Sequence, residues 1–302
     1  MRKPLKIALI SLATLAVSVV LAGVVVSWLA DRKMHRRVAL PPLQVTFAAT
    51  DGQLERGEYL FNTRGCMECH GADGGGAVVI DDEESGLFVR APNITSGGAS
   101  PARNYTDTDW MRTLRHGVKP SGEPLQIMPS EDSAQMIDAD VAAIAAYARS
   151  LPPADGGAAE LSPWPLPFKA LYLFGVVKDA AEKIDHAATV PAAVADDELA
   201  RGRYVAQVCT GCHGAHFSGG KIPGTPPSWP AASNLTTAPD SAMARYGSVE
   251  QFKTMFRTGK RPDGSAVSEV MPFKSLAHMN DAELDALFAF LKSLDARPSG
   301  QR

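Results

Sequence analysis

The distribution of hydrophobic positions divides the chain into one long apolar run and many short amphipathic segments. Residues 7–30 contain no charged side chain, and a membrane-spanning helix needs about 20 such residues. Basic side chains flank this run: Arg2, Lys3 and Lys6 stand before it, and Arg32, Lys33, Arg36 and Arg37 follow it. We therefore expect residues 1–37 to form an uncleaved N-terminal membrane anchor with basic flanks.

A cleaved signal peptide is the alternative interpretation of this run. Val20-Leu21-Ala22 offers a small-residue cleavage site, but the apolar core of a signal peptide spans only about 7–15 residues. Cleavage after Ala22 would also leave the mostly apolar residues 23–30 at the new N-terminus. Both points favour the anchor.

Helical periodicity recurs beyond residue 50. Residues 51–63 have an approximate apolar face, formed by Leu54, Tyr59, Leu60 and Phe61. Two later segments, 138–151 and 281–294, place apolar side chains three and four positions apart, which is the helical spacing: Val141, Ile144, Ala145 and Ala148 in the first, and Leu284, Leu287, Phe288 and Leu291 in the second. Asp138 and Asp281 are the predicted N-caps of these helices, and Pro152-Pro153 ends the first one.

An internal repeat organises the chain. Cys66 and Cys209 are 143 residues apart, as are Met128 and Met271. Other segments recur at nearly the same separation: Arg56-Gly57-Glu58-Tyr59 with Arg201-Gly202-Arg203-Tyr204, Asn93-Ile94-Thr95 with Asn234-Leu235-Thr236, and Arg115-His116-Gly117 with Arg257-Thr258-Gly259. Solenoid units run about 20–50 residues, so this longer period predicts two homologous domains, at residues 51–152 and 196–297.

Two connecting segments complete the predicted organisation. Residues 38–50 include Pro41-Pro42 and are expected to form a short tether. Residues 153–195 are rich in proline at first and then gather apolar side chains, namely Trp164, Phe168, Leu171, Tyr172 and Phe174. A free linker would not keep these together, so we interpret 153–195 as an inter-domain strap packed over one or both domains. The alternative is a contact surface for a partner or for the membrane.

The charge is unevenly distributed along the chain. The net charge is −3, yet residues 1–37 hold seven Lys/Arg and one Asp. The rest of the chain is therefore acidic and has no basic stripe, which argues against binding to nucleic acid.

The four cysteines of the chain fall into two copies of one motif. Cys66, Cys69 and His70 form the first C-x-x-C-H segment, and Cys209, Cys212 and His213 form the second. This is the attachment signature of c-type haem, because two thiols can each form a thioether to a haem vinyl group while the next histidine ligates the iron. The motifs predict two covalent haem c groups.

Two other uses of C-x-x-C pairs weigh less. A redox dithiol does not require histidine at the next position in both copies. A four-cysteine zinc site usually spaces its pairs by about 15–20 residues, far less than the separation between Cys69 and Cys209.

The repeat also selects a candidate for the second axial ligand. Met128 and Met271 keep the same distance from the motif histidines, and proline follows each; we expect them to ligate the irons together with His70 and His213. The other matched pair, Met136 and Met279, lies just before the closing helices, where packing is the expected role. Four histidines without a partner in the repeat are not expected to be ligands: His116, His186, His216 and His278.

At these residues the sequence resembles class I c-type cytochromes, and more closely the cytochrome subunits of bacterial membrane-bound alcohol, gluconate and aldehyde dehydrogenases. The resemblance spans roughly residues 50–297 and is carried by Arg-Gly-x-Tyr ahead of C-x-x-C-H-G, Pro92-Asn93-Ile94-Thr95, the helix end from Trp110 to Gly117, Met-Pro and the closing helix. It implies an all-α fold, with two tandem class I cytochrome c domains behind one N-terminal transmembrane helix. Because bacteria complete haem c attachment outside the cytoplasmic membrane, it also implies a single-pass inner-membrane protein with its haem domains in the periplasm.

These features predict an electron-transfer protein rather than an enzyme. It would relay electrons from a dehydrogenase subunit or a quinol-linked donor toward a terminal acceptor, such as an oxidase or a small cytochrome. The alternative is a dihaem cytochrome c peroxidase-type enzyme, which needs an iron that opens to peroxide; matched Met128 and Met271 argue against that. A haem-based sensor is disfavoured because no output domain is visible.

Overall fold

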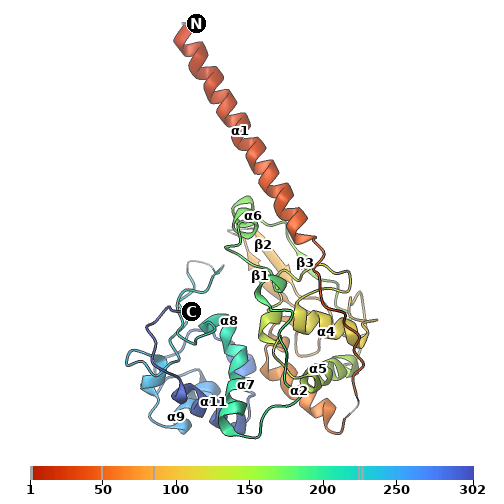
Figure 1. Ribbon diagram of the computed structural model, residues 1–302, viewed down its shortest axis with the longest axis vertical. Helices are drawn as coiled ribbons and strands as arrows, with labels where there is room; N and C mark the ends of the chain where they lie inside the picture. Colours follow the sequence, from red (N-terminus) through yellow and green to blue (C-terminus); the bar gives the residue numbers. More distant parts are fainter. Residues whose placement is uncertain (1–2, 49, 84–85, 224, 226–227) are drawn as a thin grey trace.

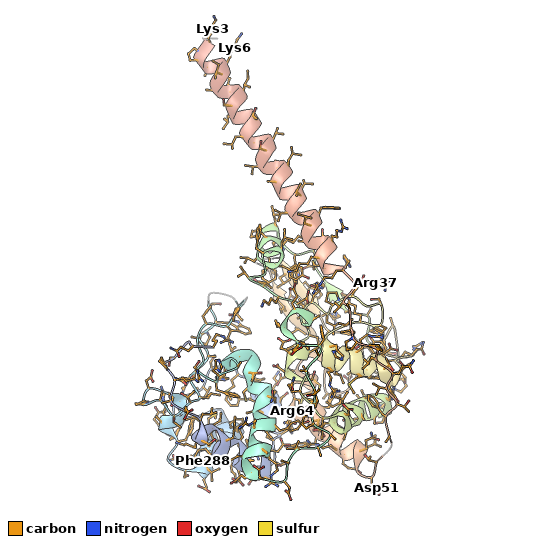
Figure 2. The ribbon with its side chains drawn as sticks, viewed as in Figure 1. Lys3, Lys6, Arg37, Asp51, Arg64 and Phe288 are labelled. Carbon is orange, nitrogen blue, oxygen red and sulfur yellow. The ribbon has the colours of Figure 1, made fainter. Side chains whose placement is uncertain are left out.

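The computed structural model describes residues 3–48, 50–83, 86–223, 225 and 228–302. One long helix, α1 (Lys3–Met34), projects from a body of two helical lobes (Figure 1). Among the described residues, α1 alone is long and apolar enough to cross a membrane. Lys3 and Lys6 lie at its far end and Arg37 at the body (Figure 2); Arg2, of the expected basic flank, lies outside the described residues.

The two lobes have a similar order of helices, and the second has the additional 3-10 helices η3 and η4. In the first domain these are α2 (Gln53–Thr63), α3 (Cys66–His70), α4 (Asp107–His116), the short 3-10 helix η1 (Ser130–Asp132) and α5 (Asp138–Ser150). In the second they are α7 (Glu198–Ala206), η3 (Gln207–Cys209), α8 (Thr210–His213), η4 (Ala242–Arg245), α9 (Val249–Thr258), α10 (Phe273–Leu276) and α11 (Asp281–Ser293). The expected all-α, two-domain architecture is confirmed.

The first and last helices of each domain cross at a glycine. A Cβ atom added at Gly57 of α2 would lie 2.1 Å from the carbonyl oxygen of Ala143 in α5. One added at Gly202 of α7 would lie 2.0 Å from the carbonyl oxygen of Ala286 in α11. The Arg-Gly-x-Tyr repeat therefore allows two backbones to approach more closely than any side chain would permit.

The cores of the two lobes use different side chains. The first is rich in alanine around Leu60, Trp110 and Met111, whereas the second is aromatic, with Phe252 and Phe290 among its members. Both include the methionine that precedes the closing helix, Met136 or Met279, as a buried residue.

The starts of the closing helices differ from the predicted caps by one position. Asp138 and Asp281 are the first helical residues, and the capping positions belong to Ile137 and Asn280. The Asn280 side chain accepts a hydrogen bond from the backbone N–H of Glu283, at 2.8 Å. The two aspartates instead place negative charge in the first turn, where the helix dipole favours it.

A small antiparallel sheet, which the sequence did not predict, extends the first domain. Its strands are β1 (Val78–Asp82), β2 (Leu87–Arg90) and β3 (Glu160–Leu161), in that spatial order. The third strand comes from the segment between the domains, so that segment lies against the first domain. The same segment continues as α6 (Leu166–Leu173), which packs beside α1, and as η2 (Ala181–Lys183).

Candidate haem-attachment sites

The two C-x-x-C-H motifs fold into equivalent short helices. In each, the glycine after the histidine has a positive φ, +75° at Gly71 and +80° at Gly214, which turns the chain sharply out of the helix. All four cysteines are free thiols and partly accessible. Burial raises the pKa of both Cys66 and Cys209 to about 12.

Each motif histidine is oriented by a backbone carbonyl. The His70 Nδ1 donates to the carbonyl oxygen of Pro92 at 2.8 Å, and the His213 Nδ1 donates to that of Ser233 at 2.7 Å. Burial lowers the pKa of both imidazoles, which favours the neutral ring. With its proton on Nδ1, each ring keeps the lone pair of Nε2 for a metal.

A buried asparagine follows each of these carbonyls. The Asn93 side chain donates to the carbonyl oxygens of Gly97, Ala154 and Gly156, and Asn234 donates to that of Arg297. Each asparagine therefore fixes the loop that carries the histidine-binding carbonyl to the chain beyond the closing helix. Sequence analysis found these residues as a repeat but assigned them no role; their occurrence at matched positions was the available signal.

The matched methionines differ in burial. Met128 and Met271 are only partly buried and pack against the edges of the two cores. Met136 and Met279, in contrast, are 7% and 1% exposed and lie inside those cores. A sulfur at the core edge remains accessible to a group inserted there, whereas a core methionine is already enclosed by side chains.

The residues present fit covalent haem in both domains. Each offers two unpaired thiols, a neutral imidazole with Nε2 free and a partly buried thioether beside an apolar core. Sulfur and imidazole ligands of this kind suit haem iron. The described residues contain no cluster of three or more histidines, cysteines or carboxylates that could hold another metal.

Two of the histidines outside the motifs contact each other. His116 and His186 pair with each other, with 3.2 Å between their Nδ1 atoms. Burial and the neighbouring His186 lower the pKa of His116 to about 4. This pair joins the end of α4 to the segment between the domains.

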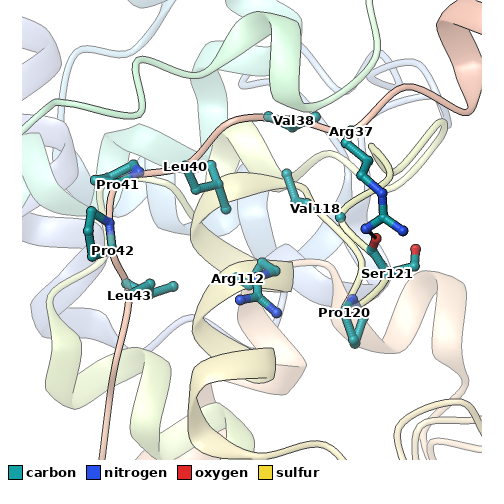
Figure 3. Close-up of a pocket in the computed structure, with 11 residues that line it drawn as sticks. Arg37, Val38, Leu40, Pro41, Pro42, Leu43, Arg112, Val118, Pro120 and Ser121 are labelled. Carbon is teal, nitrogen blue, oxygen red and sulfur yellow. Dashed lines mark hydrogen bonds between the residues drawn. The ribbon is translucent and has the colours of Figure 1, made fainter.

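A surface pocket also lies away from the motifs. It has a volume of about 380 Å³ and is lined by the tether and the loop after α4 (Figure 3). The Arg37 guanidinium closes one side by donating to the carbonyl oxygen of Ser121, at 2.6 Å. Leu43 and Arg112 line the pocket, but no motif residue does.

The two domains face each other through reciprocal contacts. The Tyr59 hydroxyl accepts a hydrogen bond from the backbone N–H of Asn280, and the equivalent Tyr204 hydroxyl accepts one from Ile137, both at 3.1 Å. Two copies of one surface that exchange equivalent contacts form an approximately two-fold interface, as in a symmetric dimer.

Both attachment helices take part in this interface. The Glu68 carboxylate of α3 accepts a hydrogen bond from the backbone N–H of Ser275 in α10, at 2.8 Å. At the matching place, Gly211 of α8 lies against Asp132 of η1, and a Cβ added at Gly211 would be 2.9 Å from the Asp132 Oδ1. Each attachment helix thus contacts the segment that follows Met-Pro in the opposite domain.

Among the described residues, the ion pairs that cross the interface are made by arginines of the first domain. The Arg56 guanidinium binds Asp140 through two hydrogen bonds of 2.9 and 2.8 Å and reaches the Glu283 carboxylate at 3.3 Å. Arg64, whose side chain is 4% exposed, donates to the same carboxylate at 2.7 Å. Both arginines belong to the first domain. The equivalent of Arg56 in the second domain, Arg201, pairs instead with the exposed Asp196.

Sequence comparison relates both domains of this chain to known cytochromes c. A family model described as cytochrome c matches residues 54–152 and 199–295. The chain is 29% identical over 289 residues to a gluconate 2-dehydrogenase cytochrome c subunit from Pantoea cypripedii, covering 84% of this chain and 62% of that protein. It is 28% identical over 272 residues to a fructose dehydrogenase cytochrome subunit from Gluconobacter japonicus, covering 82% of this chain and 54% of that protein.

A third relative is also described as the cytochrome c subunit of a dehydrogenase. An alcohol dehydrogenase (quinone) cytochrome c subunit from Gluconobacter oxydans is 26% identical over 303 residues, covering 87% of this chain and 60% of that protein. The chain thus spans little more than half the length of these relatives. The resemblance expected from the motifs is confirmed over both domains.

Proposed function

This chain belongs to the cytochrome c family, with one covalent haem c in each of its two domains, and we propose that it relays electrons between a dehydrogenase or quinol-linked donor and a terminal acceptor. When bound, haem supplies a one-electron change between ferric and ferrous iron. The protein supplies position, ligands and shielding. Three similar proteins are cytochrome subunits of dehydrogenases by their descriptions, which supports a dehydrogenase as the donor.

The reciprocal interface is the observation that carries this proposal. Glu68 of α3 contacts α10, and Gly211 of α8 contacts η1. The four attachment thiols therefore belong to helices that face the opposite domain. Such an arrangement suits passage of electrons through the protein from one domain to the other.

We assign the thioether bonds to Cys66, Cys69, Cys209 and Cys212. Replacing Cys66 and Cys69 together with alanine is expected to halve the covalent haem per chain, measured as pyridine haemochrome. The matched variant at Cys209 and Cys212 is expected to lose the other half. Unchanged haem content in either double variant would refute the assignment of that motif.

The proposed axial ligands are His70 with Met128 and His213 with Met271. Met128→Leu and Met271→Leu remove a sulfur at nearly constant volume, so each is expected to open one iron, lower its reduction potential and admit carbon monoxide. Met136→Leu and Met279→Leu are the matched controls, because they change a buried packing residue at a cost below about 1.5 kcal/mol. A control that bound carbon monoxide as readily would overturn the ligand assignment.

Two closed irons also distinguish the relay from an enzyme. The reduced wild-type protein is expected to bind carbon monoxide at neither haem and to consume no peroxide. Stoichiometric binding at one haem, together with steady peroxide turnover, would replace the relay with the dihaem peroxidase-type enzyme.

We further propose that α1 anchors the protein in the bacterial inner membrane as a single pass, with the haem domains in the periplasm. Support comes from the uncharged run at residues 7–30 and from haem c itself, whose attachment is completed outside the cytoplasmic membrane in bacteria. The protein is expected to remain in membranes through a high-salt wash and to be cleaved by protease added to spheroplasts. Protection of the haem domains in intact spheroplasts would contradict this orientation.

The partner is to be identified by isolation. The detergent-solubilised native protein is expected to co-purify with a dehydrogenase subunit or to be reduced by one in membranes. A protein that purifies alone and is reduced only by quinol would assign the donor to the quinol-linked class instead.

A further inference from the structure

The helix α6 lies alongside the end of α1 that meets the body (Figure 1). At its start, a Cβ added at Gly23 would lie 3.2 Å from the Leu166 Cδ2. One turn later the Lys169 ammonium donates to the Ser27 hydroxyl at 3.0 Å and to the Asp31 carboxylate at 2.8 Å. The two helices are therefore packed side by side along the length of α6, which fixes the height of α6 along α1.

One face of α6 is buried and the other is exposed and apolar. Tyr172 is fully buried against α1 and Trp164. Leu166, which lies beside α1, is still 46% exposed, and large apolar side chains are exposed on the opposite side of α6 and in the turn that follows: Leu171 at 42%, Phe174 at 76% and Val176 at 60%. An apolar surface of this kind on a short segment marks an interaction site.

The height of α6 along α1 identifies what covers this surface. A helix rises about 1.5 Å per residue, so about 20 residues cross the hydrocarbon core. Counted from Ile7, the core ends near Val26, which puts Gly23 inside it and Ser27 and Asp31 among the headgroups. The start of α6, which touches Gly23, reaches the same depth, and its far end, where the Tyr172 carbonyl oxygen accepts a hydrogen bond from the Lys33 ammonium at 2.7 Å, lies level with the basic residues that follow the core.

The side chains of α1 near α6 are of the kinds found at the membrane–water interface. Trp28 is 57% exposed, and the Arg32 guanidinium lies 5.5 Å from its ring centroid. Tryptophan with adjacent basic residues is typical of the membrane–water interface, where basic groups meet lipid phosphates.

We propose that residues 166–177 form a second membrane contact, a foot whose apolar side chains lie among the headgroups, with Leu166 at the acyl boundary, in the leaflet on the side of the haem domains. This inference rests on the proposed anchoring by α1. Interfacial segments bury their apolar face by about 5–10 Å at this boundary. With α1, the foot gives the body two attachment points and so fixes its tilt relative to the membrane.

Spin labels at single introduced cysteines test the proposal in the full-length holoprotein in phospholipid vesicles. The native cysteines are consumed by haem attachment, so only the introduced thiol is labelled. Labels introduced by Phe174→Cys and Val176→Cys probe the foot. A label introduced by Leu199→Cys is the control, because Leu199 is an exposed apolar residue of the second domain. A label introduced by Val17→Cys probes the middle of α1. Two haems per chain verify that each variant is folded.

Labels at 174 and 176 are expected to collide several-fold more often with oxygen, and less often with a water-soluble nickel chelate, than the label at 199. Labels at 174 and 176 that match 199, with 17 still inside the bilayer, would overturn the foot and leave the anchor intact. Nickel access at 17 would overturn the anchor and the foot together. Shielding of 174 from both reagents would mean that protein covers this surface, which also overturns the foot.

Discussion

The two haem domains share their internal construction and differ in what surrounds them. Both cross two helices at a glycine, orient the motif histidine by a backbone carbonyl and fix that loop with an asparagine. Only the first is covered by the tether, the small sheet, the strap and the end of α1. The repeated features are those that the haem requires, and the features that differ connect the first domain to α1.

The cores show how freely the remaining positions vary. The closing helix of the first domain packs Ala143, Ala145 and Ala148, whereas that of the second packs Leu287, Phe290 and Leu291. Protein interiors require filled volume rather than particular residues, so an alanine-rich helix and an aromatic helix can serve the same architecture.

The largest expected effect comes from the crossing glycines. Gly57→Ala and Gly202→Ala would each put a Cβ about 2 Å from a carbonyl oxygen, so each should destabilise its own domain by at least about 3 kcal/mol. Alanine in an open helix position would instead stabilise by up to about 1 kcal/mol. We expect each variant to lose covalent haem from the altered domain alone, measured by haem content and mass spectrometry of haem peptides.

A matched control is available outside the helix crossings. A Cβ added at Gly157 meets nothing within 4 Å, so Gly157→Ala should keep both haems. Equal retention of haem in all three variants would show that the two crossings are not close-packed.

The second effect concerns a titratable group found in one domain only. Burial and the charge of Glu131 raise the pKa of Asp132 to about 7, from an ordinary 3.8; the matched position in the other domain is Ser275. The folded protein therefore holds a proton that the unfolded chain releases near pH 4. Stability is highest below that pH and falls as the pH rises through 7, by up to about 4 kcal/mol.

Asp132→Asn should remove this pH dependence. The variant is expected to be more stable than wild type at pH 8 and nearly equal at pH 4, measured by urea denaturation at both pH values. Ser275→Ala should leave the wild-type pH profile unchanged. Parallel profiles for wild type and Asp132→Asn would rule out a protonated carboxyl at this interface.

The smallest expected effect is the loss of stability when the ion pairs made by the first domain at the interface are broken. Arg56→Gln leaves the buried Asp140 without its main partner and weakens the hold on Glu283, so it should destabilise by about 2–3 kcal/mol. Arg201→Gln, at the equivalent position, breaks only an exposed pair and should cost less than about 0.5 kcal/mol. Urea midpoints of the two variants measure the difference, and equal midpoints would contradict the asymmetry of the interface.

The sequence was sufficient for the features that depend on local spacing. Helical periodicity predicted the closing helices, and the repeat predicted two equivalent domains. The start of each closing helix was wrong by one residue because Asp138 and Asp281 are favourable both at the cap and in the first turn, and only backbone geometry distinguishes these positions.

Features that join distant segments could not be predicted in this way. The strand Glu160–Leu161 is only two residues long, and its partner Leu87–Arg90 lies far away in the chain. The role of Asn93 depends on carbonyls near residue 155 that no spacing reveals. The reciprocal contacts of Tyr59 and Tyr204 require the relative placement of whole domains, although the repeat had marked both tyrosines.

The covalent connection between the two domains changes what their interface must achieve. Separate copies would have to associate at whatever concentration the cell maintained, whereas linked copies meet at an effective concentration that is set by the segment joining them. An interface held by hydrogen bonds and ion pairs is then sufficient. Linked halves can also diverge separately: a homodimer encoded once would form the same ion pairs on both sides, whereas here Arg56 and Arg64 reach Glu283 of the other domain and the matching Arg201 pairs with Asp196.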